Sequence, residues 1–117
     1  MTVHRMEQVD SVIHHQLSRI IARDIEFPPD VLVTLTRVKT ARDLAVCKVW
    51  ITVLPAVYVH TALSVLIRKV KEIEQLLSHH IQLKKNPRLI FMEDVTGERA
   101  LEMEEILDTL KTQQEDD

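Results

Sequence analysis

The sequence predicts a single α+β domain in which helices pack on one face of a three-stranded mixed sheet. Two apolar, β-rich runs form a hairpin-like pair near the middle of the chain, and amphipathic helical patterns lie on either side of it. A chain of 117 residues is long enough for one hydrophobic core and too short for two domains. The expected order of elements is α-β-β-α-β-α, which buries every apolar stripe of the sequence against one sheet.

The hairpin occupies Val31–Leu54, where the two runs are separated by the polar or small residues Lys39–Asp43. Side chains alternate between the faces of a strand. In the second run, small apolar residues such as Val49 therefore face the helices, whereas Lys48 and Trp50 lie on the open face.

The first run follows the same alternation, with Leu35 facing inward and Thr36 facing outward. We expect Arg37, Lys39 and Arg42 to cluster at the tip of the hairpin. This run is the more continuously apolar, so we expect its strand at the centre of the sheet, antiparallel to the second strand and beside the third.

Helical spacing predicts the elements around the hairpin. From Met6 to Arg23 one apolar stripe is expected to face the core; it comprises Val9, Val12, Ile13, Leu17, Ile20 and Ile21. A second helix is expected from Val59 to His80, followed by a third strand over Arg88–Glu93 and a last helix over Glu98–Leu110. We expect one domain over residues 1–110 and a disordered acidic tail over residues 111–117.

Composition excludes several classes of protein. No run approaches eighteen apolar residues, so no membrane span is expected. The first ten residues lack an apolar signal core, and the single Cys47 cannot form an internal disulfide, so we expect a cytoplasmic protein. The single glycine, Gly97, excludes a P-loop and a dinucleotide fingerprint, which both need several glycines.

The net charge of −3 conceals an asymmetry along the chain. Residues 1–92 hold thirteen Lys/Arg and eight Asp/Glu, a net +5, whereas residues 93–117 hold two and ten, a net −8. A basic body is compatible with a polyanionic partner. A solvated helix face and a frayed end would produce the same pattern, and charge alone does not separate the two interpretations.

No motif supports catalysis or a cofactor. Cys47 is expected inward, in the core, rather than as a nucleophile. The pairs His14-His15 and His79-His80 point about 100° apart on a helix, which makes each a poor metal site. We therefore expect no enzyme activity, no cofactor, no metal site and no small-molecule substrate.

What remains is a binding surface for RNA, formed by cations that neutralise phosphates and by one aromatic platform for a base. The candidate residues are Arg37, Lys39, Arg42, Lys48, Trp50, Arg68, Lys69, Lys71, Lys84, Lys85 and Arg88.

Three segments of the chain, in order, resemble the bacterial ribosome-binding factor A family. They are QVDSVIHHQLSRIIARDIEFPP, LVTLTRVKTARDLAVCKVWITVL and NPRLIFMEDVTGERALEMEEIL, of which TRVKTARDLAVCKVWITVL is the most specific. The resemblance implies a type II KH-like fold and a ribosome biogenesis factor without enzyme activity. Such a factor binds the small (30S) subunit late in assembly, assists processing of the 5′ end of 16S rRNA, matters most in the cold and leaves when a maturation GTPase acts. We expect it to be a monomer.

The sequence departs from the family at its helix kink. The family carries an Ala-x-Gly kink within the long helix, which falls here at Lys69-Val70-Lys71. Because the glycine is missing, we expect a straighter helix, with the two lysines free to contact phosphate.

An alternative hypothesis is a small protein-interaction module. In it the acidic last helix docks on a partner, or on a second copy, through Ile106, Leu107 and Leu110. The simpler version of this hypothesis is that the helix caps its own domain.

Overall fold

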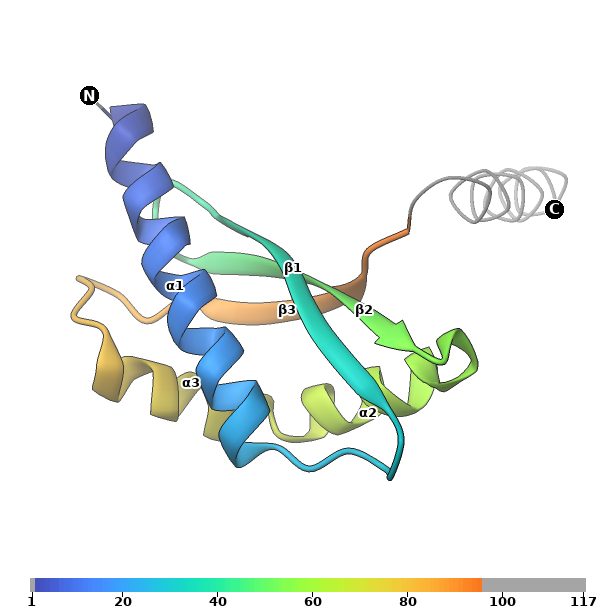
Figure 1. Cartoon of the computed structure of the whole chain (residues 1–117). Coiled ribbons are helices and arrows are strands. Elements are labelled where there is room, and N and C mark those ends of the chain that lie inside the picture. Colours follow the sequence, from blue (N-terminus) through green and yellow to red (C-terminus); the bar gives the residue numbers. More distant parts are fainter. Residues whose placement is uncertain (1, 96–117) are drawn as a thin grey trace, which may run out of the picture.

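The computed structural model describes residues 2–95, and its elements follow the predicted order (Figure 1). Three helices, three strands and one short 3₁₀ helix are found in this part of the chain: α1 (Thr2–Asp24), β1 (Leu32–Thr40), β2 (Val46–Leu54), η1 (Ala56–Tyr58), α2 (Val59–Arg68), α3 (Val70–His80) and β3 (Arg88–Glu93). The predicted last helix and acidic tail lie outside the described residues.

The sheet is mixed, as predicted, but its strand order is β1-β2-β3, so the expectation of a central β1 was wrong. β1 pairs with β2 antiparallel, and β2 pairs with β3 parallel through the crossover that α2 and α3 form. The burial of the strands agrees with this order. Its inward side chains Cys47, Val49 and Ile51 are 0% exposed, whereas the apolar run of β1 begins at Leu32, which is 59% exposed. Unbroken apolarity therefore did not identify the central strand.

β1 extends into the predicted turn, as far as Thr40, and contains a bulge. The register with β2 shifts between Leu35 and Arg37, so the two consecutive residues Thr36 and Arg37 are both exposed. Alternation then resumes with Val38 facing the core. Arg37 and Lys39 therefore lie within the strand and not at the tip of the hairpin, where they were expected. A bulge inserts one residue into a strand, so every later side chain points to the opposite face from the one that strict alternation predicts.

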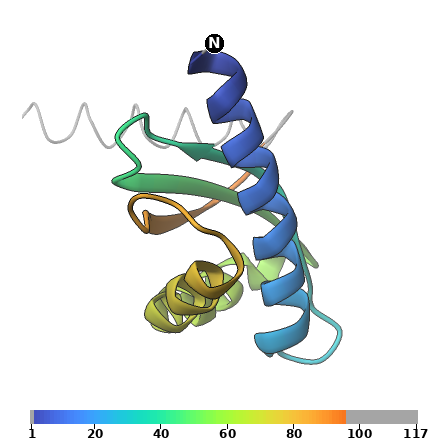
Figure 2. The same ribbon diagram turned by 90° about the vertical axis from the view of Figure 1, so that its left-hand side faces the viewer.

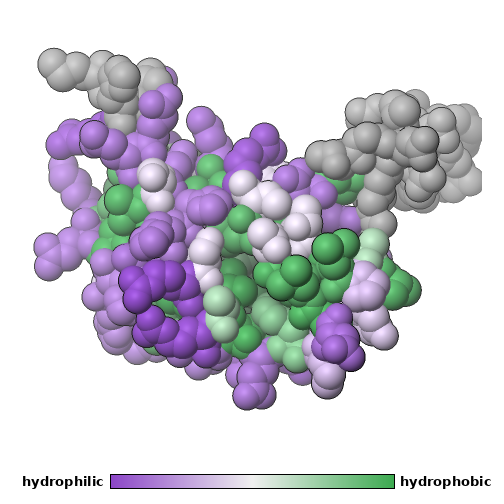
Figure 3. Space-filling view, viewed as in Figure 1, coloured by the Kyte–Doolittle hydropathy of each residue, from purple (hydrophilic) through white to green (hydrophobic). Residues whose placement is uncertain are grey.

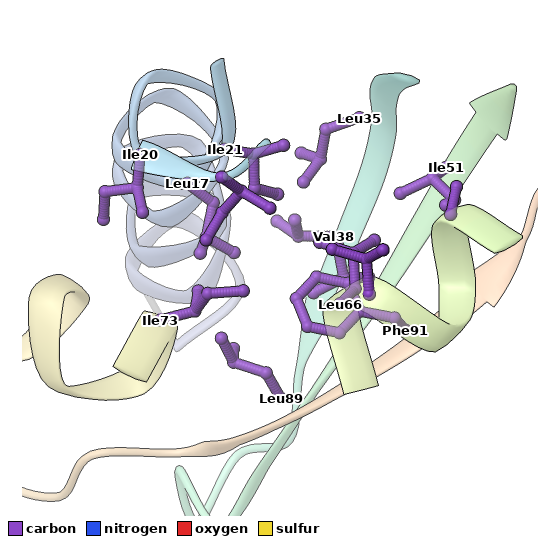
Figure 4. Packing of buried hydrophobic residues seen from close by; sticks show 14 of the residues in the cluster. Leu17, Ile20, Ile21, Leu35, Val38, Ile51, Leu66, Ile73, Leu89 and Phe91 are labelled. Atoms are coloured by element: carbon purple, nitrogen blue, oxygen red, sulfur yellow. The ribbon is translucent and has the colours of Figure 1, made fainter. Parts of the chain in front are cut away.

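The helices gather on one side of the sheet (Figure 2). Ile21 of α1 lies beside Leu35 of β1 in Figure 4, and Leu17 and Ile20 belong to the same buried cluster. The same close-up shows the core residues of the other helices and of β3, which are Leu66, Ile73, Leu89 and Phe91. The predicted α1 stripe is confirmed except at Val12, which is 46% exposed. One face of the sheet is thus covered, and no helix of residues 2–95 covers the other.

The long helix begins and ends where predicted, but it is interrupted at Lys69. The expectation of a straighter helix was therefore wrong. Lys69 has φ −100° and ψ 10°, a conformation at negative φ that is open to residues with a side chain, so the interruption needs no glycine. Leu66 and Ile73, on either side of it, are both 0% exposed, so both segments pack on the same core.

Candidate nucleic-acid interface

The candidate interface begins with the uncovered face of the sheet, which we term the open face. Its side chains alternate with the buried ones along each strand. The open face consists of Thr34, Thr36, Arg37 and Lys39 of β1, Val46, Lys48, Trp50 and Thr52 of β2, and Arg88, Ile90 and Met92 of β3.

Arg37 and Trp50 form the aromatic part of the open face. They are cross-strand partners, and the Arg37 guanidinium carbon lies 3.9 Å from the centre of the Trp50 ring. The bulge puts Arg37 there, since strict alternation would have turned it inward. The Thr36 hydroxyl donates a 2.6 Å hydrogen bond to Asp94 Oδ2, which holds the bulge against the residue that follows β3. A stacked cation–aromatic pair presents a charge and a flat apolar surface together.

Lys39, Lys48 and Arg88 concentrate positive charge at one end of the open face. Lys39 and Lys48 are directly opposed in the antiparallel pair, and Arg88 pairs with Val46, two residues from Lys48 along β2. Like charges placed opposite each other destabilise a sheet. An anion bound between them would relieve this repulsion.

Two connections add cations at this same end, which we term the basic end. The β1–β2 turn carries Arg42, and the α3–β3 connection carries Lys84 and Lys85; both connections lie on the left in Figure 1. The Arg88 amide donates a 3.0 Å hydrogen bond to the Ala45 carbonyl, which ties the second connection to the turn. The basic end thus consists of Lys39, Arg42, Lys48, Lys84, Lys85 and Arg88.

Arg68, Lys69 and Lys71 form a second, separate group at the helix interruption. They are exposed on α2 and α3, on the side of the sheet opposite the open face. Lys69 Nζ lies 3.8 Å from a carboxylate oxygen of Glu72, a pair that is exposed and weak. The structure therefore divides the predicted basic residues into two groups, which cannot contact one flat segment of RNA together.

Cys47 lies in the core, as predicted, and burial raises the pKa of its thiol. The Thr40 hydroxyl donates to Cys47 Sγ at 3.5 Å, and the Thr40 amide donates to Asp10 Oδ1 of α1 at 2.9 Å. Asp10 thus fastens α1 to the end of β1. A buried, protonated thiol is a poor nucleophile, so this cluster supports the fold and not a reaction.

An exposed apolar cluster lies at the opposite end of the sheet from the basic end. Leu32 and Leu54 are register partners there, and Val57 and Tyr58 follow in η1; Val57 is 79% exposed. Figure 3 shows the hydrophobic surface gathered toward α2 and the end of β2, whereas hydrophilic surface covers α1 and α3. We term these four residues the apolar end. β3 finishes at this end, because it runs parallel to β2.

Sequence reasoning found the charges of the open face but missed its aliphatic strip. Ile90 and Met92 of β3 lie beside Lys48 and Trp50, and Ile90 is 36% exposed. The sequence RLIFME of β3 contained this information, because alternation places Ile90 and Met92 on the face opposite Leu89 and Phe91. The bulge was also detectable from the sequence. Strict alternation would place the charged residues Arg37 and Lys39 at inward positions of an apolar strand, and such a conflict indicates a bulge.

Comparison with known proteins identifies the family. A family model described as ribosome-binding factor A matches residues 5–107. The chain belongs to the ribosome-binding factor A family. Ribosome-binding factor A of Desulforamulus reducens is 30% identical over 112 residues, which cover 95% of this chain and 93% of that protein.

Solved structures of the family support the fold. The crystal structure of ribosome-binding factor A from Thermus thermophilus matches with a TM-score of 0.67 and 20% identity, over 75% of this chain and 93% of that one. A homology model of the Thermus thermophilus protein, fitted into an electron cryomicroscopy map of a 30S–RbfA complex, matches with a TM-score of 0.56 and 25% identity. That match covers 69% of this chain and 90% of the other. The KH-like α+β fold expected from the sequence is confirmed. Within residues 2–95, no helix has the length and apolarity that crossing a bilayer requires.

Proposed function

We propose that this chain binds the small ribosomal subunit through the open face and the basic end. The observation that supports this most strongly is the opposed pair Lys39 and Lys48, with Arg88 beside it, on a face that also carries Trp50. Phosphates between these cations would remove their mutual repulsion and release counterions. The family adds the partner, since its Thermus thermophilus member is seen in a 30S complex.

The chemistry of the surface favours positioning over catalysis. Arg37 and Trp50 offer one stacked platform, which suits one splayed base and not a run of bases. The remaining cations are suited to contact phosphates, and such contacts do not depend on the RNA sequence. The protein is accordingly a binding factor of the cytoplasm, not an enzyme. It holds rRNA of the immature subunit, assists maturation of the 16S 5′ end and is needed most at low temperature.

Two experiments test this function. The chain should sediment with immature small subunits and less with mature ones. In a bacterial strain that lacks its own family member, the chain should restore 16S 5′-end processing at low temperature. A variant with Lys39→Gln, Lys48→Gln and Arg88→Gln should fail to do so, whereas the matched variant with Arg68→Gln, Lys69→Gln and Lys71→Gln should succeed. Full processing by the first variant would contradict the assignment of the open face.

A further inference from the structure

The open face combines two kinds of surface, and a polynucleotide backbone accounts for only one of them. The cations suit phosphate, but Ile90 and Met92 form an aliphatic strip along β3, beside Lys48 and Trp50. An aliphatic strip bordered by cations is complementary to an amphipathic segment that carries acidic residues.

The chain contains such a segment immediately after β3. Residues 98–110 carry Leu101, Ile106, Leu107 and Leu110 at helical spacing, together with five carboxylates. Residues 93–117 hold ten Asp/Glu and two Lys/Arg, a net −8, against a net +5 for residues 1–92. The excess of negative charge is therefore joined by a few residues to the face that carries the positive charge.

The length and the starting point of the segment both fit the open face. β3 has six residues, and a strand of that length extends about 20 Å. A helix over the thirteen residues from Glu98 to Leu110 would extend about 20 Å as well. The described chain leaves the sheet at Asp94, whose amide donates a 2.7 Å hydrogen bond to the Ile51 carbonyl. A reversal after this point falls at Gly97, the single glycine of the chain, which tolerates the backbone angles that a tight reversal requires.

We propose that the acidic segment 98–110 docks on the open face of its own chain and competes there with RNA. Docking runs the segment back along β3, over Ile90, Met92 and Trp50, and carries its acidic residues toward the basic end. The apolar end lies closer to the exit of the chain, but the segments that form it carry no Lys or Arg, since residues 24–36 and 49–67 contain none. Charge therefore selects the open face. The competition rests on the proposed function, whereas the docking itself does not.

Trp50 is the only tryptophan of the chain, so it reports docking without RNA. In the full chain, Glu102→Gln with Glu105→Gln should shift Trp50 emission to longer wavelength and increase its quenching by acrylamide. Raising the salt concentration should produce the same shift in the unmodified chain and none in the variant. The matched control, Asp24→Asn with Glu26→Gln, removes two charges from exposed positions around the end of α1 and should leave Trp50 unchanged.

Small-subunit affinity tests the competition. If docking occupies about four-fifths of the molecules, the Glu102/Glu105 variant should bind about fivefold more tightly, since only undocked molecules are competent. The control variant should change affinity much less, although its net charge is the same.

Several results would overturn the proposal. Identical Trp50 quenching in the variant and the unmodified chain at every salt concentration would exclude docking. A quenching that depends on protein concentration would assign the open face to a second copy. Protection of the apolar end from labelling, lost in the same variant, would assign the segment to that end. A Trp50 response without a gain in affinity would exclude the competition. If the unmodified chain binds no small subunit, the proposed function is wrong. The Trp50 quenching would then still show whether the segment docks.

Discussion

At the scale of single residues, Lys39 and Lys48 are the positions where the proposed binding role would conflict with stability. Their ammonium groups project from directly opposed positions of β1 and β2. Opposed like charges destabilise a strand pair, whereas opposite charges stabilise it by a few tenths of a kcal/mol to about 1 kcal/mol. We attribute the persistence of this pair to the anion that we propose it binds.

Charge reversal tests this explanation. Lys48→Glu should raise the free energy of unfolding by about 0.5 kcal/mol, because it forms an opposite-charge pair with Lys39, and should weaken small-subunit binding. Lys39→Glu should do the same. The double reversal restores repulsion and should lose the gain, as measured by chemical denaturation in a double-mutant cycle. A cycle without coupling would show that the two side chains do not interact.

At the scale of elements, some features followed from local patterns and others did not. The bounds of β3 and the outer ends of the α2–α3 unit were predictable, because prolines and helical spacing mark them. Strand order was not, since the central position of β2 depends on the crossover that brings β3 beside it. The bulge at Thr36 depends on pairing with β2 and with Asp94, which local alternation does not contain.

The interruption at Lys69 forms without a glycine, at negative φ. The glycine of the family's Ala-x-Gly pattern falls at Lys71, and introducing it there should not stabilise this chain. Lys71 lies inside α3, so Lys71→Gly should lower the free energy of unfolding by about 0.5–1 kcal/mol. Lys71→Ala is the control and should leave it unchanged or higher. A gain in thermal stability with glycine would show that the interruption is strained.

At the scale of the whole molecule, the fold separates two basic groups that the sequence could only count together. One occupies the open face and the basic end, and the other occupies the helix interruption. All the cations of the candidate interface were predictable, because charged residues in a small domain are exposed. Their division between two sides was not, since it depends on which face of the sheet the helices cover.

The salt dependence of small-subunit binding tests the central claim most directly. Each phosphate contact contributes about 0.7 to 0.9 to the slope of log affinity against log salt. Replacing Lys39, Lys48 and Arg88 by Gln should therefore reduce that slope by about 2 to 3 and weaken binding strongly at low salt. The matched replacement of Arg68, Lys69 and Lys71 should change the slope much less. Equal slopes for the unmodified chain and the first variant, or a loss confined to the second, would contradict the open face as the surface that binds rRNA.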